Sequence, residues 1–180
     1  MDEQLIARVK GMILAPDREW QVIRGEPVEL VPLFTRYVMI LAAIPAIAGM
    51  LAMMMFGLFF SAIGTAIVGY VLSVAGVFVT AKIIEILAPN FGGPQDAEAA
   101  LKLAAFAPTA AWVAGGAIII PLLGGLVALA GGLYSLYTLY RGVPVVMRVP
   151  QERALTFTLA VIGVAIVVNI AVRVLTGVFF

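Results

Sequence analysis

Few polar side chains interrupt the apolar parts of this sequence, and they are the first candidates for chemistry. Lys82 and Glu85 are three residues apart, so on a helix they share a face and can form an ion pair. Lys82 can alternatively extend its ammonium towards water. Asn169 is the one strongly polar side chain in the last apolar run, where we expect it to hydrogen-bond to a neighbouring helix. These three residues are the predicted polar contacts between or beside apolar helices.

The chain contains no cysteine and no histidine, which excludes several kinds of catalytic site. Without cysteine there can be no disulfide, no thiol nucleophile and no thiolate metal site. Without histidine there can be no serine protease triad, no HExxH zinc site and no histidine-ligated haem. No acid–base pair or nucleophile constellation can be assembled from the remaining residues. We therefore predict a protein that is not an enzyme and that has no metal site and no cofactor.

Three long runs without a charged side chain indicate whether this chain lies in water or in a membrane. They extend over Tyr37–Ala81, Leu103–Tyr140 and Ala154–Val172. Hydrophobic residues make up 63% of the chain and charged residues 12%, whereas a soluble protein has about 45–50% and about 25%. A lipid bilayer accounts for this excess, because a larger soluble core does not need such long uncharged runs.

The lengths of these runs predict an all-α membrane bundle. A helix needs about 20 residues to cross the hydrocarbon, so the first two runs hold two crossings each and the third holds one. The predicted helices are 33–56, 62–87, 97–120, 123–141 and 154–176. Residues 31–180 form the predicted five-helix transmembrane domain, and residues 1–30 form an amphipathic segment before it.

The positions of the basic residues predict the orientation. Ten of the eleven Lys and Arg residues precede helix one or flank the loops between helices two and three and between four and five. Only Arg173 lies towards the opposite side. Because positive loops remain in the cytoplasm, the N-terminus is predicted inside and the C-terminus outside. The expected location is the inner or cytoplasmic membrane, crossed several times.

The first residues show helical periodicity. Leu5, Val9, Met12 and Ile13 share one face, which predicts a short helix lying on the lipid headgroups. A solvated tail is the alternative. Pro16 suits the start of a second helix.

Residues at the predicted cytosolic face are the candidates for an interaction surface. Gly92 and Gly93 break the chain between helices two and three, where a tight connector is the simpler interpretation. The arginines between helices four and five can reach headgroups or can serve as topological anchors. The candidate surface consists of Trp20, Gly92, Gly93, Asp96, Tyr137, Arg141 and Arg148.

Small residues also recur every four positions in two predicted helices, and we expect them to allow close internal packing. The stripes are Ser61, Thr65, Gly69 and Ser73 in helix two, and Gly124, Ala128 and Gly132 in helix four. Self-association along such a stripe is the alternative. Pro45 and Pro108 fall inside predicted helices and should bend or break them.

Several short motifs resemble the bacterial branch of the Yip-one family, the Ypt/Rab-interacting membrane proteins. The matching segments are Pro16–Trp20, Gly92-Gly93, Ala105–Pro108, Tyr134–Tyr140 with Gly142 and Pro144, and Val149-Pro150 with Ala154. The resemblance implies five transmembrane helices and a cytosolic N-terminus. Eukaryotic members bind Rab GTPases, but this chain lacks their long N-terminal region and their DLYGP-type motif. Rab binding is therefore not carried over.

The expected function is to organise membranes or partner proteins through the cytosolic face. The expected partners are membrane lipids and a cytosolic protein, with self-association left open and no nucleic acid. The alternative is translocation of a small solute, an ion or a lipid, as a transporter, channel or scramblase. An intramembrane enzyme ranks last.

Overall fold

The computed structural model describes the backbone of residues 3–179 and the side chains of residues 3–167. Over the described backbone the regular structure is helical, without a strand. The elements are α1 (Glu3–Leu14), α2 (Pro16–Gly25), α3 (Leu30–Leu33), the π-helix η1 (Phe34–Val38), α4 (Met39–Met55), α5 (Phe59–Leu87), the 3₁₀ helix η2 (Ala88–Phe91), α6 (Ala97–Phe106), α7 (Thr109–Gly115), the 3₁₀ helix η3 (Gly116–Ile119), α8 (Leu123–Val146) and α9 (Gln151–Phe179).

Four helical stretches of the described chain are long and apolar enough to cross a bilayer. They are Leu30–Met55, Phe59–Phe91, Ala97–Ile119 and Leu123–Val146, close to the first four predicted helices. The predicted helix 154–176 falls within α9, whose side chains beyond residue 167 lie outside the described part. The prediction of an all-α bundle of apolar helices is thus confirmed.

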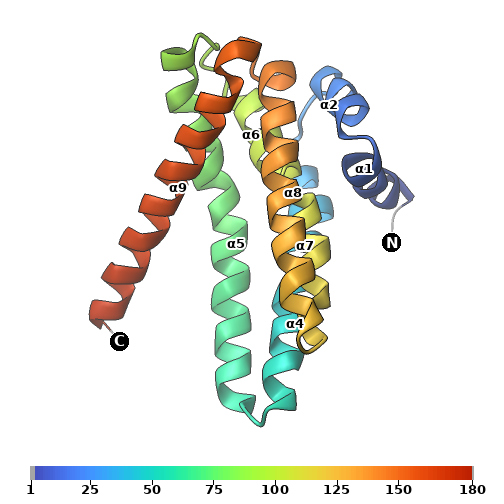
Figure 1. Ribbon diagram of the computed structural model, residues 1–180, viewed down its shortest axis with the longest axis vertical. Helices are drawn as coiled ribbons and strands as arrows, with labels where there is room; N and C mark the ends of the chain where they lie inside the picture. The colour runs from blue at the N-terminus through green and yellow to red at the C-terminus, as the bar shows by residue number, and fades with distance from the viewer. Residues whose placement is uncertain (1–2, 180) are drawn as a thin grey trace.

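The long helices run side by side, with their connections at two opposite ends (Figure 1). The α4–α5 turn lies at the lower end of Figure 1, where Gly57 has a φ of 79° that favours glycine. The α5–α6 and α8–α9 connections lie at the upper end, and α2 is near that end beside α8. Helix α9 starts at the upper end and leans away from the bundle along its length.

The third crossing is broken at Pro108, as the sequence predicted. Proline has no amide hydrogen and cannot continue the helical hydrogen bonds, so α6 ends just before it and α7 begins after it. Side chains of α8 compensate for the break. Thr138 donates its Oγ1 hydrogen to the Ala107 carbonyl at 3.0 Å, and Ser135 Oγ accepts the Ala111 amide hydrogen at 2.9 Å. Pro45, in contrast, stays inside a continuous α4.

The predicted stripe of small residues on helix two is not an internal packing face. Ser61, Thr65 and Gly69 are exposed on α5, and only Ser73 contacts a buried partner, accepting a hydrogen bond from the Trp112 indole at 3.1 Å. The four-residue spacing identified one face of the helix, but the neighbouring helices pack against another.

The stripe on helix four is wrong at one end. A methyl group added at Gly132 would have no atom within 4 Å, whereas one at Gly124 would lie 2.2 Å from the Ala117 carbonyl oxygen. The close approach to α7 is made at Gly131, where an added methyl would lie 2.2 Å from the Ala114 side chain. Backbones therefore approach each other at Gly124, which the stripe included, and at Gly131, which is one residue before the predicted Gly132.

Candidate interaction surface at the charged end

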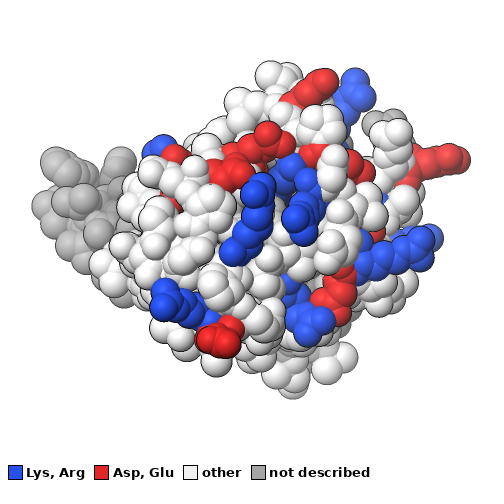
Figure 2. All heavy atoms as spheres, turned by 90° about the horizontal axis from the view of Figure 1, so that it is seen from above, with Lys and Arg blue, Asp and Glu red and all other residues white. Residues whose placement is uncertain are grey.

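Charged side chains gather at the upper end of the bundle. Figure 2, which views the molecule from above, shows acidic and basic groups interspersed over this face. Three of the five ion pairs among the described side chains join different elements. The ion pairs within the described side chains are Arg8–Glu19, Arg8–Glu26, Lys82–Glu85, Lys102–Glu98 and Arg141–Asp17. This end is therefore a network of both signs, not a uniformly basic patch.

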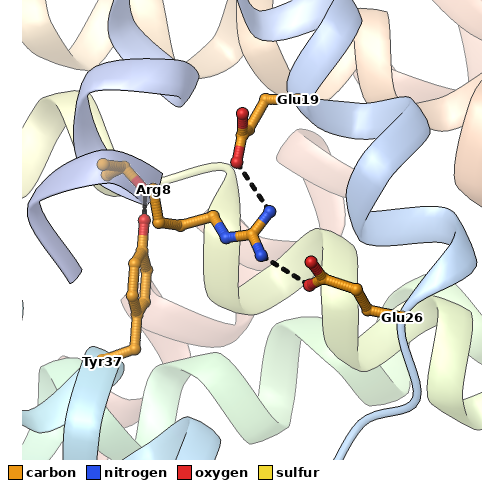
Figure 3. A network of polar contacts seen from close by, with 5 residues as sticks. Arg8, Glu19, Glu26 and Tyr37 are labelled. Carbon is orange, nitrogen blue, oxygen red and sulfur yellow. Dashed lines mark hydrogen bonds and ion pairs between the residues drawn. The ribbon is translucent and has the colours of Figure 1, made fainter. Parts of the chain in front are cut away.

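Arg8 holds α1 against α2 and against the chain that follows α2 (Figure 3). Its guanidinium donates to Glu19 Oε1 at 2.6 Å and also to Glu26. The same group lies 5.6 Å above the centre of the Phe106 ring. Burial by itself lowers the pKa of Arg8, but the hydrogen bonds and charges of Glu26 and Glu19 outweigh it, so the pKa lies above its usual value. Arg8 is thus a permanently charged clamp.

A cavity of about 640 Å³ lies beside this clamp. Its wall is formed by α1, α2, the extended residues 26–29 and the first turns of the helix that leads into α4. Tyr37, whose hydroxyl lies 2.7 Å from Thr109 Oγ1, and Phe106 contribute aromatic surface to it. Glu29 and Arg36 also line the cavity. Among the described side chains neither has an ion-pair partner.

Trp20 is buried in the core, so its predicted place on the candidate interaction surface is wrong. Its side chain has no solvent exposure, and its indole donates a hydrogen bond of 2.9 Å to the Thr138 carbonyl. Gly142 makes room for the ring, because a methyl group there would lie 2.6 Å from Trp20 Cε2 and from Leu103 Cδ2. Trp20 therefore positions α2 on α8 and faces no solvent.

Two further predicted residues also fix α2 and α6. Arg141 forms an ion pair with Asp17 and so ties the end of α8 to the start of α2. Asp96 caps α6, since its carboxylate accepts the Ala99 amide hydrogen at 3.0 Å.

The two glycines and Arg148 belong to loops that pack on each other. Gly92 has a φ of 84° and lies next to Pro150, and a methyl group at Gly93 would lie 2.7 Å from Val149 Cγ2. Arg148 is exposed and has a φ of 53°, which is uncommon for a residue with a side chain. Gly92 and Gly93 thus act as a tight connector, which was the simpler of the two interpretations from the sequence.

The remaining candidates lie elsewhere. Tyr137 is 45% exposed on α8. The expected Lys82–Glu85 ion pair is present at 2.8 Å, on the end of α5. The Asn169 side chain lies outside the described residues. The structure therefore does not gather the predicted residues into one site.

Sequence reasoning missed the residues that build this end of the molecule. Arg8 meets Glu19 only because α1 and α2 fold back on each other at Leu14–Pro16, and no spacing rule joins positions so far apart. Lys102 is only 6% exposed and forms an ion pair with Glu98 at 3.0 Å. The four-residue spacing of Glu98 and Lys102 was a signal that could have found this pair.

Comparisons with known proteins agree with this architecture. The family model described as the Yip1 domain matches residues 10–172. The chain is 26% identical over 176 residues to the inner membrane protein YohC of Escherichia coli strain K12, covering 91% of this chain and 90% of that protein. It matches the same protein of Escherichia coli O6:H1 equally well. No solved structure matches the chain.

The predicted location, a multi-pass protein of the cell membrane, is confirmed by this relative together with the four apolar helices. The resemblance seen in the short motifs is confirmed over nearly the whole length of the chain. An integral membrane protein of the Yip1 domain family is therefore what this sequence encodes.

Proposed function

We propose that this protein organises the membrane or its partners through its charged end, without catalysing a reaction. The observation that carries the proposal is the concentration of paired charges at one end of an otherwise apolar bundle. Helix α2 is docked there by contacts to α6 and α8, and α1 by the Tyr134 hydroxyl of α8, which donates a hydrogen bond to the Ile13 carbonyl, so the end presents a fixed surface. A surface that is already fixed favours binding of a partner, because little conformational freedom is lost on association.

The proposal includes five crossings with the charged end in the cytoplasm. Helix α9 has 29 residues, enough to cross as a fifth helix, and it runs from the charged end towards the opposite end (Figure 1). Basic residues occur on α1 and α2, at the end of α5, on α6 and around the α8–α9 connection. Figure 2 shows basic groups on the upper face. The positive-inside rule places that end in the cytoplasm and the end of α9 outside.

A site-specific crosslinking experiment in living cells tests the proposal. A photoreactive amino acid would replace exposed residues at the charged end, Arg18 and Gln21, and for comparison Leu122, which is 94% exposed at the opposite end. We expect the same discrete adducts from Arg18 and Gln21 and none of them from Leu122. Equal adducts from both ends would contradict the proposal.

Translocation, the alternative, is tested with purified protein in liposomes. The organiser proposal expects ion and lipid flux equal to that of empty vesicles. Cysteines introduced singly at Gly69, Ala128 and Asn169 add a second readout, because the natural chain has none. Flux above the empty vesicles, with labelling of these positions by aqueous reagents, would replace the organiser with a conduit.

A further inference from the structure

We propose that the cavity between α1, α2 and the start of α4 binds the headgroup of a phospholipid that carries both a phosphate and a primary ammonium. Phosphatidylethanolamine is the lipid class with this chemistry. The inference deepens the proposed function by giving the charged end a ligand. It rests on that function only in placing this end of the bundle at a membrane surface.

The cavity lies at the start of the first stretch that is long and apolar enough to cross a bilayer. It is lined on one side by Glu26 and Glu29, which precede the apolar stretch Leu30–Met55, and on the other by Leu33 and Tyr37, which belong to its first turns. A cavity at the start of a crossing helix is within reach of the polar part of a lipid, which lies directly outside the hydrocarbon. Its volume of about 640 Å³ is in the range of small-molecule sites.

The charges that remain available in the cavity have opposite signs. Arg8 is engaged by Glu19 and Glu26, whereas Glu29 and Arg36 have no ion-pair partner among the described side chains. A simple anion would satisfy Arg36 and leave a lining carboxylate opposed to it. A simple cation would satisfy Glu29 and leave Arg36 unpaired. A ligand with one group of each sign satisfies both.

The order of these two charges along the chain matches the order of groups in the lipid. Arg36 follows Glu29 by seven residues, which is about 10 Å along a helix. It is therefore the deeper of the two. In phosphatidylethanolamine the phosphate is attached to the glycerol, and the ammonium lies farther from the acyl chains. Arg36 can thus bind the phosphate while Glu29 accepts hydrogen bonds from the ammonium.

The backbone and the mouth of the cavity are consistent with a lipid. Arg36 lies on the π-helix η1, a local insertion into a helix of the kind that often marks functional sites. Next to the lining residues, Leu30 and Val31 are 51% and 68% exposed. These apolar side chains provide a surface for the acyl chains, which a soluble phosphate compound does not have.

Native mass spectrometry of the purified protein in detergent tests the proposal. Phosphatidylethanolamine, phosphatidylcholine and phosphatidylglycerol with the same acyl chains would be added at equal concentrations. We expect one phosphatidylethanolamine to be retained about tenfold more strongly than either other lipid. Phosphatidylcholine has the same net charge but its quaternary ammonium cannot donate hydrogen bonds, and phosphatidylglycerol has no ammonium.

Variants connect the binding to this cavity. Arg36→Gln and Glu29→Gln should each reduce retention of phosphatidylethanolamine about tenfold, while Lys82→Gln, on α5 outside the cavity, should not. Val22→Trp adds bulk at a lining residue and should block binding with every charge in place. Thermal unfolding of each variant identifies any that fails to fold. If a charge variant fails, Val22→Trp still tests whether the lipid binds in this cavity.

Three results would overturn the inference. The first is equal retention of phosphatidylethanolamine by wild type, Arg36→Gln and Val22→Trp. The second is equal retention of phosphatidylglycerol by the wild type. The third is displacement of the lipid by glycerophosphoethanolamine at an equal concentration, which would indicate a site for a soluble compound. The crosslinking and flux experiments do not depend on the lipid, so failure of the proposed function would be recognised separately.

Discussion

At the scale of single residues, the charged end is held together by side chains with specific partners on other elements. Trp20 fits only because position 142 is glycine, and Arg8 is held by Glu19 and Glu26 at once. These contacts join segments that are distant in sequence, so each one fixes the position of a whole helix. Substitutions at these residues should therefore change both stability and the accessibility of α1 and α2.

Gly142→Ala tests the fit of Trp20. The added methyl group would lie 2.6 Å from the indole and must displace it, which breaks the bond to the Thr138 carbonyl. We expect a loss of about 1–3 kcal/mol in unfolding free energy, measured in detergent. Gly132→Ala, on the same helix with open space around it, should be neutral or slightly stabilising. Similar stability of both variants would contradict this interpretation of Gly142.

Arg8→Met tests the clamp on α1. Methionine keeps much of the apolar contact with Phe106 but leaves Glu19 and Glu26 without their shared cation. We expect α1 to be released, at a cost of about 1–2 kcal/mol. Limited proteolysis should then cut between α1 and α2 faster than in the wild type. Lys10→Met, an exposed residue of α1, should leave the cleavage rate unchanged; equal protection of α1 in both variants would argue against the clamp.

At the scale of elements, the break at Pro108 is the feature that shapes the bundle. Helices α6 and α7 form one crossing in two pieces, and α8 repairs the gap with two hydroxyl groups. In a membrane such repair is needed, because no water is available for a backbone group that has lost its helical partner. The upper piece packs under α2, while the lower piece packs closely on α8 at Gly131.

Ser135→Ala tests this repair. It removes the acceptor for the Ala111 amide hydrogen next to the break, and we expect a loss of about 1–2 kcal/mol in unfolding free energy. Thr35→Val is a matched control, because the Thr35 hydroxyl bonds to a carbonyl of its own helix at an exposed position. A thermal unfolding series in one detergent compares the two variants. A cost for Ser135→Ala no larger than that for Thr35→Val would contradict the repair.

At the scale of the whole molecule, the paired charges at one end define the orientation that we propose. The other end, where α4 turns into α5, is built from small and apolar residues. We expect this asymmetry to make the protein insert in a single orientation, because the basic residues resist transfer across the membrane.

Topology reporters test this orientation directly. Fusions after residues 60, 92, 122 and 148 should report outside, inside, outside and inside. Each reporter pair, such as alkaline phosphatase and a fluorescent protein, controls for expression because the two are active on opposite sides. Exchange of inside and outside at all four positions would invert the proposed orientation and move the charged end out of the cytoplasm.

Much of the architecture could be predicted from the sequence, because the bilayer imposes strong rules on length and charge. The first four helices and the break at Pro108 followed from apolar runs and from proline chemistry. The packing faces did not follow, since periodicity reveals a stripe but not the partner it meets, as Gly69 and Gly132 show. The contacts of Arg8 and Trp20 depend on tertiary folding and have no local signal.

The docking of α2 on α8 also sets the order of folding during synthesis, because α2 cannot dock before α8 has been made. Trp20 bonds to a residue 118 positions later, and Asp17 to one 124 positions later. At a translation rate of about 5–20 residues per second, the first helices emerge roughly 6–25 s before their partners exist. During that interval the apolar faces of these helices can be covered only by the membrane surface or by a chaperone. The N-terminus, made first, is thus among the last parts to reach its final place.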